Sequence, residues 1–313
     1  MKTRDIIAIL VAGLASALFV LSAARLGPGG MPLLLLGAFP IYVAALCYGT
    51  VAGVGSSIVA ILVAGIVGST QSAIVIGFAF TIPASIIGHQ VNLAQQDADG
   101  NLEWFPLPQL FFNLCAMLSI GIIALGFLVG YDEALLSNQM KAAVEEILRQ
   151  NPDAQTMTPA ELDGFANGII RIMPFVFSGV WLVVHVANLY LSGIVARSLS
   201  LMPRPRDDIP ATANLPRIAL FILIASIVLA SFASGQVQLV SGVVAGIFIM
   251  AFALLGLANL HLKSRQNPGG LLLVIIAYAL IAILYLPIYL FAVTGIFRNI
   301  NGIPAYPPSK NGQ

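Results

Sequence analysis

The sequence predicts an all-α protein, a polytopic bundle of transmembrane helices with a short helical extramembrane insertion. Hydrophobic residues make up 59% of the 313 positions and charged residues only 9%, whereas soluble domains carry about 25% charged residues. The apolar residues form about nine stretches, each close to the roughly 17 to 25 residues that cross a bilayer core. We therefore expect a single membrane domain over residues 1–313.

Each apolar stretch is expected to be helical, because backbone groups that face lipid need hydrogen-bond partners within their own segment. The expected cores are 6–24, 32–48, 51–68, 72–90, 108–130, 172–197, 217–234, 239–262 and 271–296. The first stretch follows a basic start and resembles a signal peptide, but its length favours a retained helix.

Lys and Arg residues in short connections predict the orientation, because they are enriched on the cytosolic side. With nine spans and a cytosolic N-terminus, eight of the fourteen are cytosolic: Lys2, Arg4, Arg197, Arg204, Arg206, Arg217, Lys263 and Arg265. The other six are Arg25, Lys141, Arg149, Arg171, Arg298 and Lys310. We expect the bacterial cytoplasmic (inner) membrane. A re-entrant stretch at 51–68 would instead return the C-terminus to the cytosol.

Two connections and the chain end have patterns of their own. Residues 91–106 predict a cytosolic hairpin, because Asp99-Gly100 is typical of a tight turn. Residues 198–216 predict a stiff, charged cytosolic linker, and residues 297–313 a flexible tail.

The insertion at 132–171 is expected to contain two amphipathic helical pieces. Pro152 lacks an N–H and biases Asn151 away from helical geometry, which predicts a break there. Thr158 and Glu161 have the spacing of a capping box, so a long helix is expected to begin at this point and to continue into the sixth span.

Signatures of catalysis, metal binding and nucleic-acid binding are missing from the sequence. His89, His185 and His261 lie in three separate segments without metal-ligand spacing. The Gly-rich segment 53–57 lacks the Lys of a phosphate loop. The net charge of +1 offers no basic surface for nucleic acid. We expect no enzyme, no catalytic or metal-binding residue, no cofactor and no nucleic-acid partner.

Polar residues instead follow the helix faces. The predicted spans also lack deep Asp, Glu and Lys residues, which disfavours an ion-driven transporter. One stripe at helical spacing occupies the sixth span: Ser178, Trp181, His185, Asn188 and Ser192. Two interpretations are open. The stripe can join helices by hydrogen bonds, or it can belong to a small-molecule cavity whose binding residues are Trp181, His185, Asn188, Asn113 and Tyr285. A polar cavity around His185 favours the second interpretation, and a tightly filled core favours the first.

Motifs spread over almost the whole chain resemble those of the YybS-like family of bacterial membrane proteins, a family of unknown function. The motifs are Asp99–Leu107, Val186–Leu191, Pro203–Pro205, Leu215-Pro216, Leu255–Leu257, Tyr278 and Pro287. The chain departs from the family at Ile296–Arg298, where an acidic residue is usual. The resemblance implies a distant similarity to the substrate-binding subunits of energy-coupling-factor transporters and to the rod-shape protein MreD. Ala8 and Ala12 resemble the small-residue motif with which such subunits dock their coupling partner.

Two functions follow as hypotheses. One is a solute-binding membrane subunit that depends on partner proteins for energy. The other is a non-catalytic scaffold or assembly protein of the cell envelope. The expected partners are the lipid bilayer, membrane proteins and, for the first hypothesis, a small-molecule ligand.

Overall fold

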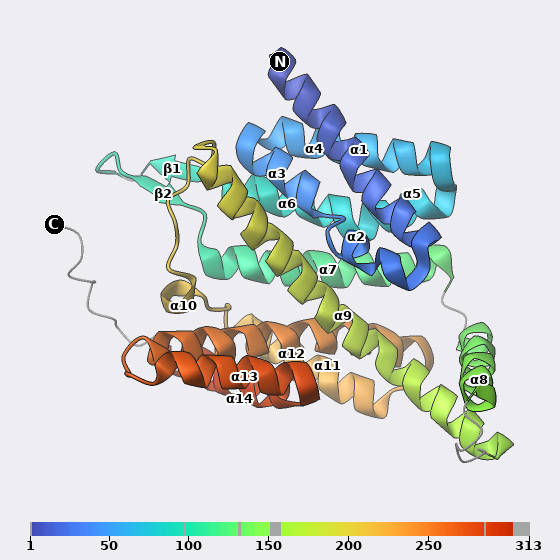
Figure 1. Cartoon of the computed structure of the whole chain (residues 1–313). Coiled ribbons are helices and arrows are strands. Elements are labelled where there is room, and N and C mark those ends of the chain that lie inside the picture. Colours follow the sequence, from blue (N-terminus) through green and yellow to red (C-terminus); the bar gives the residue numbers. More distant parts are fainter. Residues whose placement is uncertain (1, 97, 131–132, 151–157, 285, 303–313) are drawn as a thin grey trace.

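The fold is almost entirely helical. The computed structural model describes residues 2–96, 98–130, 133–150, 158–284 and 286–302. Helices make up 84% of it, and the strands found in this part are two short ones, so the predicted all-α class is confirmed (Figure 1).

The N-terminal half contains short helical pieces that follow one another closely. They are α1 (Thr3–Leu26), η1 (Gly27–Gly30), α2 (Met31–Leu35), α3 (Phe39–Tyr48), α4 (Thr50–Val63), η2 (Ala64–Gly68), α5 (Thr70–Ile76), η3 (Gly77–Thr81) and α6 (Ile82–Val91). Four of these pieces begin beside a proline, namely Pro28 in η1, Pro32 in α2, Pro40 in α3 and Pro83 in α6. Proline has no N–H and is tolerated in a first helical turn, so each marks a break within an apolar run.

The remaining elements include the longest helices. They are β1 (Ala94–Gln96), β2 (Leu102–Trp104), α7 (Leu107–Val129), α8 (Glu133–Gln150), α9 (Pro159–Ser198), α10 (Ile209–Thr212), α11 (Ile218–Phe232), α12 (Gly235–Ser264), α13 (Gly270–Leu284) and α14 (Pro287–Asn301). Figure 1 shows α9 crossing the molecule between the N-terminal helices and the C-terminal group. It packs against α3 on one side and α12 on the other, and α12 also packs against α11 and α14.

Six helical stretches of the described residues are long and apolar enough to cross a membrane. They are Thr3–Tyr48, Thr50–Gly68, Thr70–Val91, Leu107–Val129, Pro159–Ser198 and Gly235–Ser264. The first holds two predicted spans, because the chain turns at Gly27 (φ 58°) and α3 folds back against α1. Helices α11 and α13 are apolar but shorter. The predicted count of about nine spans is therefore not confirmed.

The predicted span 271–296 is not one helix, and that prediction was wrong. It is divided between α13 and α14, which pack against each other and against α12. Pro287 opens α14 and cannot continue a preceding helix. Each of the two helices has 15 residues, which is about 22 Å and shorter than a bilayer core of about 30 Å. Helix α14 also runs to Asn301, so the predicted tail at 297–313 begins inside a helix, and its residues 303–313 lie outside the described part.

The hairpin and the insertion have regular local structure. Strands β1 and β2 pair antiparallel, and Gly100 takes a φ of 83° in their turn, a value that favours glycine. In the insertion, α8 ends at Gln150 and α9 begins at Pro159, and the predicted break at Asn151-Pro152 lies outside the described residues. Thr158 and Glu161 form the capping box, with the Thr158 N–H donating to the Glu161 carboxylate at 2.7 Å.

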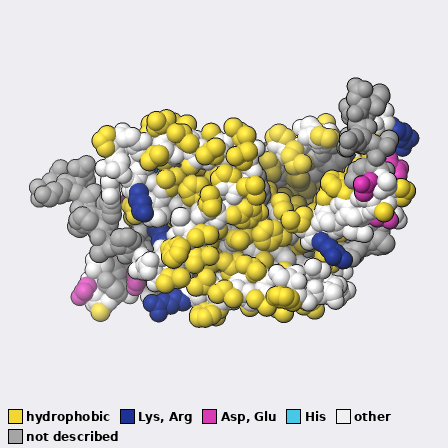
Figure 2. All heavy atoms as spheres, turned by 90° about the horizontal axis from the view of Figure 1, so that it is seen from below, with side chains coloured by type: hydrophobic (Ala, Val, Ile, Leu, Met, Phe, Trp, Pro, Cys, Tyr) yellow, Lys and Arg dark blue, Asp and Glu magenta, His cyan; other side chains and the backbone are white. Residues whose placement is uncertain are grey.

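Lys and Arg side chains gather at the two ends of the helices, and Figure 2 shows apolar surface between them. One end holds Lys2, Arg4, Arg197, Arg204, Arg206, Arg217, Lys263, Arg265 and Arg298. We call it the basic end. The opposite end, here called the insertion end, holds Arg25, Lys141, Arg149 and Arg171.

Contacts between segments define the basic end. Arg4 lies over the ring of Tyr48, and Arg265 is paired with Asp208 of the linker. Arg298 donates to the Ala213 carbonyl at 2.7 Å. The prediction that Arg298 lies on the side opposite the linker was therefore wrong, because α13 and α14 reverse the chain once more than one span would.

Candidate functional site

The polar stripe of α9 is buried in the centre of the molecule. Its members are Ser178, Trp181, His185, Asn188 and Ser192, with exposed fractions between 0% and 5%. They face the broken helices of the N-terminal half and, at Ser178, helix α12. The spacing of three and four residues that predicted the stripe thus places one helix face in a packed interface.

Trp181 and His185 both bond the carbonyl oxygen of Ala79. The Trp181 indole N–H donates to it at 2.8 Å, and the His185 Nε2 atom lies 2.9 Å from it. Ala79 lies in the π-helical turn η3, four residues before Pro83. In an α-helix this carbonyl would accept from the N–H of residue 83, and Pro83 has none to donate. The side chains of α9 supply donors in its place.

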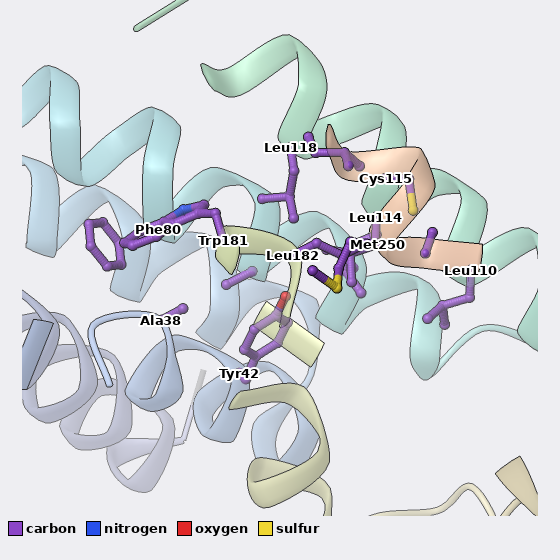
Figure 3. Packing of buried hydrophobic residues seen from close by; sticks show 14 of the residues in the cluster. Ala38, Tyr42, Phe80, Leu110, Leu114, Cys115, Leu118, Trp181, Leu182 and Met250 are labelled. Carbon is purple, nitrogen blue, oxygen red and sulfur yellow. The ribbon is translucent and has the colours of Figure 1, made fainter. Parts of the chain in front are cut away.

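These contacts fix the tautomer of His185. A carbonyl oxygen only accepts hydrogen bonds, so Nε2 must carry the proton. The hydroxyl of Tyr42, 3.1 Å from Nδ1, then donates to that nitrogen. Both ring nitrogens are bonded, and complete burial favours the neutral imidazole. Phe80 and Trp181 meet edge to face beside them, with ring centroids 4.9 Å apart, and Figure 3 shows how Tyr42, Phe80, Trp181 and Leu182 fill this region.

Further along α9, Asn188 and Ser192 donate hydrogen bonds to backbone carbonyls beside the second helix break, which lies between α2 and α3. The Asn188 amide donates to the Leu35 carbonyl at 2.7 Å, and the Ser192 hydroxyl donates to the Phe39 carbonyl at 3.2 Å. The Leu35 carbonyl is free for this bond because the N–H of Phe39 donates to Leu36 instead. Trp181, His185 and Asn188 therefore bond carbonyls at two helix breaks, which a lipid surrounding could not do.

The predicted site residues are only partly brought together. Trp181, His185 and Asn188 belong to the stripe, whereas Asn113 lies on α7 and donates to Gln90 at 3.1 Å. Tyr285 lies outside the described residues. The Asn188 Oδ1 atom is buried and has no hydrogen-bond partner in the described part of the chain.

Sequence reasoning missed the partners of the stripe. Tyr42 and the carbonyls of Ala79 and Leu35 gave no pattern of their own. The available signal was Pro40 and Pro83 inside apolar runs, because a proline at membrane depth releases a carbonyl that some other group must satisfy.

A cavity of about 430 Å³ lies at the basic end, away from the stripe. Its lining is mixed: Leu46, Cys47, Gly49, Asn92, Ser200, Leu201, Met202 and Pro203. The Asn92 amide donates to the Ala45 carbonyl at 3.0 Å, while its Oδ1 atom is buried without a partner among the described residues. The wall of the cavity thus combines apolar side chains with the polar residues Asn92 and Ser200.

Arg204 holds the linker against this end. The residue is 5% exposed, and its guanidinium donates to both carboxylate oxygens of Asp207 at 2.8 and 3.0 Å and to the Phe105 carbonyl at 2.9 Å. A two-point pair of this kind fixes the direction of both side chains. The linker is thereby tied to the hairpin and to the start of α7.

Within the described ranges, the structure contains no group of three His, Cys, Asp or Glu side chains that could hold a metal ion. Comparisons with protein-family models, with curated proteins and with solved structures give no match. The apolar helices define the class as a multi-pass membrane protein in a lipid bilayer.

Proposed function

We propose that this chain is a non-catalytic scaffold or assembly protein of the bacterial cytoplasmic membrane. The observation that carries the proposal is the state of the α9 stripe. Both nitrogens of His185 and the indole N–H of Trp181 are bonded within the protein, so these polar groups of the core hold helices together. A solute at His185 would have to break these bonds.

The distribution of charge supports a cytosolic N-terminus. Nine Lys and Arg residues of the described part lie at the basic end and four at the insertion end. Cytosolic loops carry an excess of these residues. The basic end, with the hairpin, the linker and the end of α14, is then cytosolic.

The element proposed to contact partners is the pair of α8 and the first part of α9. Helix α9 has 40 residues, about 60 Å, which is twice the thickness of a bilayer core of about 30 Å. It is therefore long enough to project beyond the lipid, and Figure 1 shows its first part beside α8. Helix α8 runs antiparallel to it, because Ser137 bonds Asn167 and Lys141 pairs with Asp163. We call this pair of helices the arm, and Phe165 is 47% exposed on it.

A charge reversal in the arm tests the scaffold. Lys141→Asp places two carboxylates together and should release α8 from α9, and native gels of gently solubilised membranes should then show loss of a larger assembly. Lys141→Asp combined with Asp163→Lys restores opposite charges and should restore the assembly. Arg149→Asp, at a 72% exposed side chain on the same helix, is the control. A protein that migrates alone in wild type and variants would overturn the proposal.

The second candidate is a solute-binding subunit, in agreement with the resemblance to energy-coupling-factor transporter subunits. The basic-end cavity favours it, because its wall includes Asn92, whose buried Oδ1 atom has no partner among the described residues. Mass spectrometry of the purified protein distinguishes the two candidates. A small molecule retained by wild type and by His185→Leu, but lost in Asn92→Leu, would support solute binding at the cavity and not at the stripe.

A further inference from the structure

An apolar groove opens along the outside of the N-terminal half, between α1 and α3. Its volume is about 650 Å³. Small side chains form much of its wall, namely Ala8, Ala12 and Ala15 of α1 with Pro40, Val43 and Ala44 of α3. Ile7 and Val11, which also line it, are 56% and 61% exposed. In a membrane, exposed apolar side chains at this position face lipid.

The groove carries positive charge at the basic end. Arg4 lines it there, and its guanidinium lies 5.2 Å from the centroid of the Tyr48 ring. The nearest acid is Asp5, 3.9 Å away, and that carboxylate also accepts the N–H of Lys2. Because the Arg4 side chain is 61% exposed, most of its donors are open to an anion beside the ring.

The length of the groove fits one leaflet. Its lining on α1 runs from Arg4 to Phe19, about 22 Å along a helix that rises 1.5 Å per residue. Half of a bilayer core is about 15 Å thick, so the lining covers a headgroup region and one layer of acyl chains. A transmembrane partner helix would need a contact surface through both leaflets.

We propose that this groove binds an anionic phospholipid of the leaflet at the basic end. The phosphate pairs with Arg4, and one acyl chain lies along the alanines towards Phe19. The charge at one end and the apolar wall beyond it match the two parts of such a lipid. This inference is independent of the scaffold function.

Native mass spectrometry of the full-length protein with added lipid tests the site. Phosphatidylglycerol and phosphatidylethanolamine with identical acyl chains are the two probes. Wild type should retain phosphatidylglycerol, the anionic lipid, in preference to phosphatidylethanolamine. Arg4→Gln should reduce that preference about fivefold, the effect of one basic residue at a membrane surface. Arg4→Lys should keep most of it.

A second pair of variants tests the groove itself. Ala12→Phe fills the groove and should remove lipid retention for both probes, whereas Leu18→Phe changes a 55% exposed side chain of the same helix outside the lining and should not. If Ala12→Phe fails to fold, Ala8→Val serves in its place. Equal retention of both lipids by wild type would overturn the proposal. So would a photoreactive residue at Ala12 that couples to a second polypeptide and not to lipid.

Discussion

The Nε2 atom of His185 lies 2.9 Å from the carbonyl oxygen of Ala79, 106 residues away in the sequence. That oxygen is the one that Pro83 leaves without its usual helical partner. A break in one helix and a polar side chain on another therefore compensate each other. The pairing explains why a histidine and a tryptophan are buried in a core made chiefly of aliphatic side chains.

His185→Leu should destabilise the protein. The change leaves the Tyr42 hydroxyl without an acceptor and the Ala79 carbonyl with one side-chain donor fewer, and an unpaired buried group costs about 1 to 3 kcal/mol. Unfolding in mixed detergent micelles measures it. Adding Tyr42→Phe should cost less in the His185→Leu background than alone, because the bond is already lost. His89→Leu, which loses a bond to the exposed Thr50, should change stability by about 0.5 kcal/mol or less.

Gly295→Ala should weaken the attachment of α14 to α12. A Cβ at Gly295 would lie 1.9 Å from the Phe252 carbonyl oxygen, which is backbone and cannot turn away. Overpacking of this kind costs about 1 to 3 kcal/mol. Gly126→Ala in α7 meets nothing within 4 Å and is the matched control. Protease cleavage of the chain between α13 and α14 should be faster in Gly295→Ala and unchanged in Gly126→Ala. Equal digestion of both would show that the close approach of α12 and α14 contributes little.

The sequence predicts some of this structure well and other parts poorly, for a physical reason. Periodicity along one helix shows that Trp181, His185 and Asn188 share a face, because that property is local. Their partners are carbonyls of α2 and η3, which depend on how distant helices meet. For the same reason, the sequence left packing and ligand binding open as alternatives at the stripe.

The helix pair α13 and α14 shows a different limit of prediction from sequence. Both helices are apolar, so the hydropathy of the sequence shows one long apolar stretch. It does not show that the chain reverses direction between α13 and α14. Pro287 was the only local sign of a new helix. The glycines at 256 and 295 become informative only when the two helices are seen to cross, since a Cβ at either position would strike the other backbone.

Arg204→Gln should loosen the linker. The change removes both bonds to Asp207 and the donor to the Phe105 carbonyl. The Asp207 side chain is 30% exposed and regains water, so we expect a loss of about 1 to 3 kcal/mol. Arg204→Lys should not restore it, because an ammonium group lacks the two-point geometry. Arg206→Gln, at an exposed neighbour, should be within about 0.5 kcal/mol of wild type. Equal stability of all three variants would contradict this role for Arg204.

The pair of Asp208 and Arg265 should respond to acid. The hydrogen bond from Arg265 is the main reason that the pKa of Asp208 lies below its ordinary value. A lowered folded-state pKa means that the pair stabilises the linker above the unfolded pKa of about 3.9, and that this stabilisation is lost as the pH falls through the folded-state pKa. Infrared titration of labelled Asp should show a higher pKa for Asp208 in Arg265→Gln. Lys263→Gln should leave it unchanged. The same titration curve in wild type and in Arg265→Gln would contradict the assignment.

The end of α14 should lie on the same side of the membrane as the linker. Arg298 donates to the Ala213 carbonyl at 2.7 Å, and the Asn299 amide donates to the Leu215 carbonyl at 2.6 Å. These bonds hold the helix end beside the segment before α11, so the C-terminal helices must return to the side from which α13 starts. In a chain without Cys47 and Cys115, Ile300→Cys and Arg206→Cys should react with a membrane-impermeant thiol reagent from the same side.

Phe232→Cys and Glu146→Cys mark the insertion end, at positions that are 87% exposed on α11 and exposed on α8. They should react only from the opposite side. Labelling is compared in right-side-out and inside-out membrane vesicles. If positive charge sets the orientation, Arg206→Cys should be labelled from the cytosolic side. If Ile300→Cys instead reacts together with Phe232→Cys, then α13 and α14 form one span in the membrane. The hydrogen bonds from Arg298 and Asn299 to the linker would then be absent there, because those groups would lie on opposite sides of the bilayer.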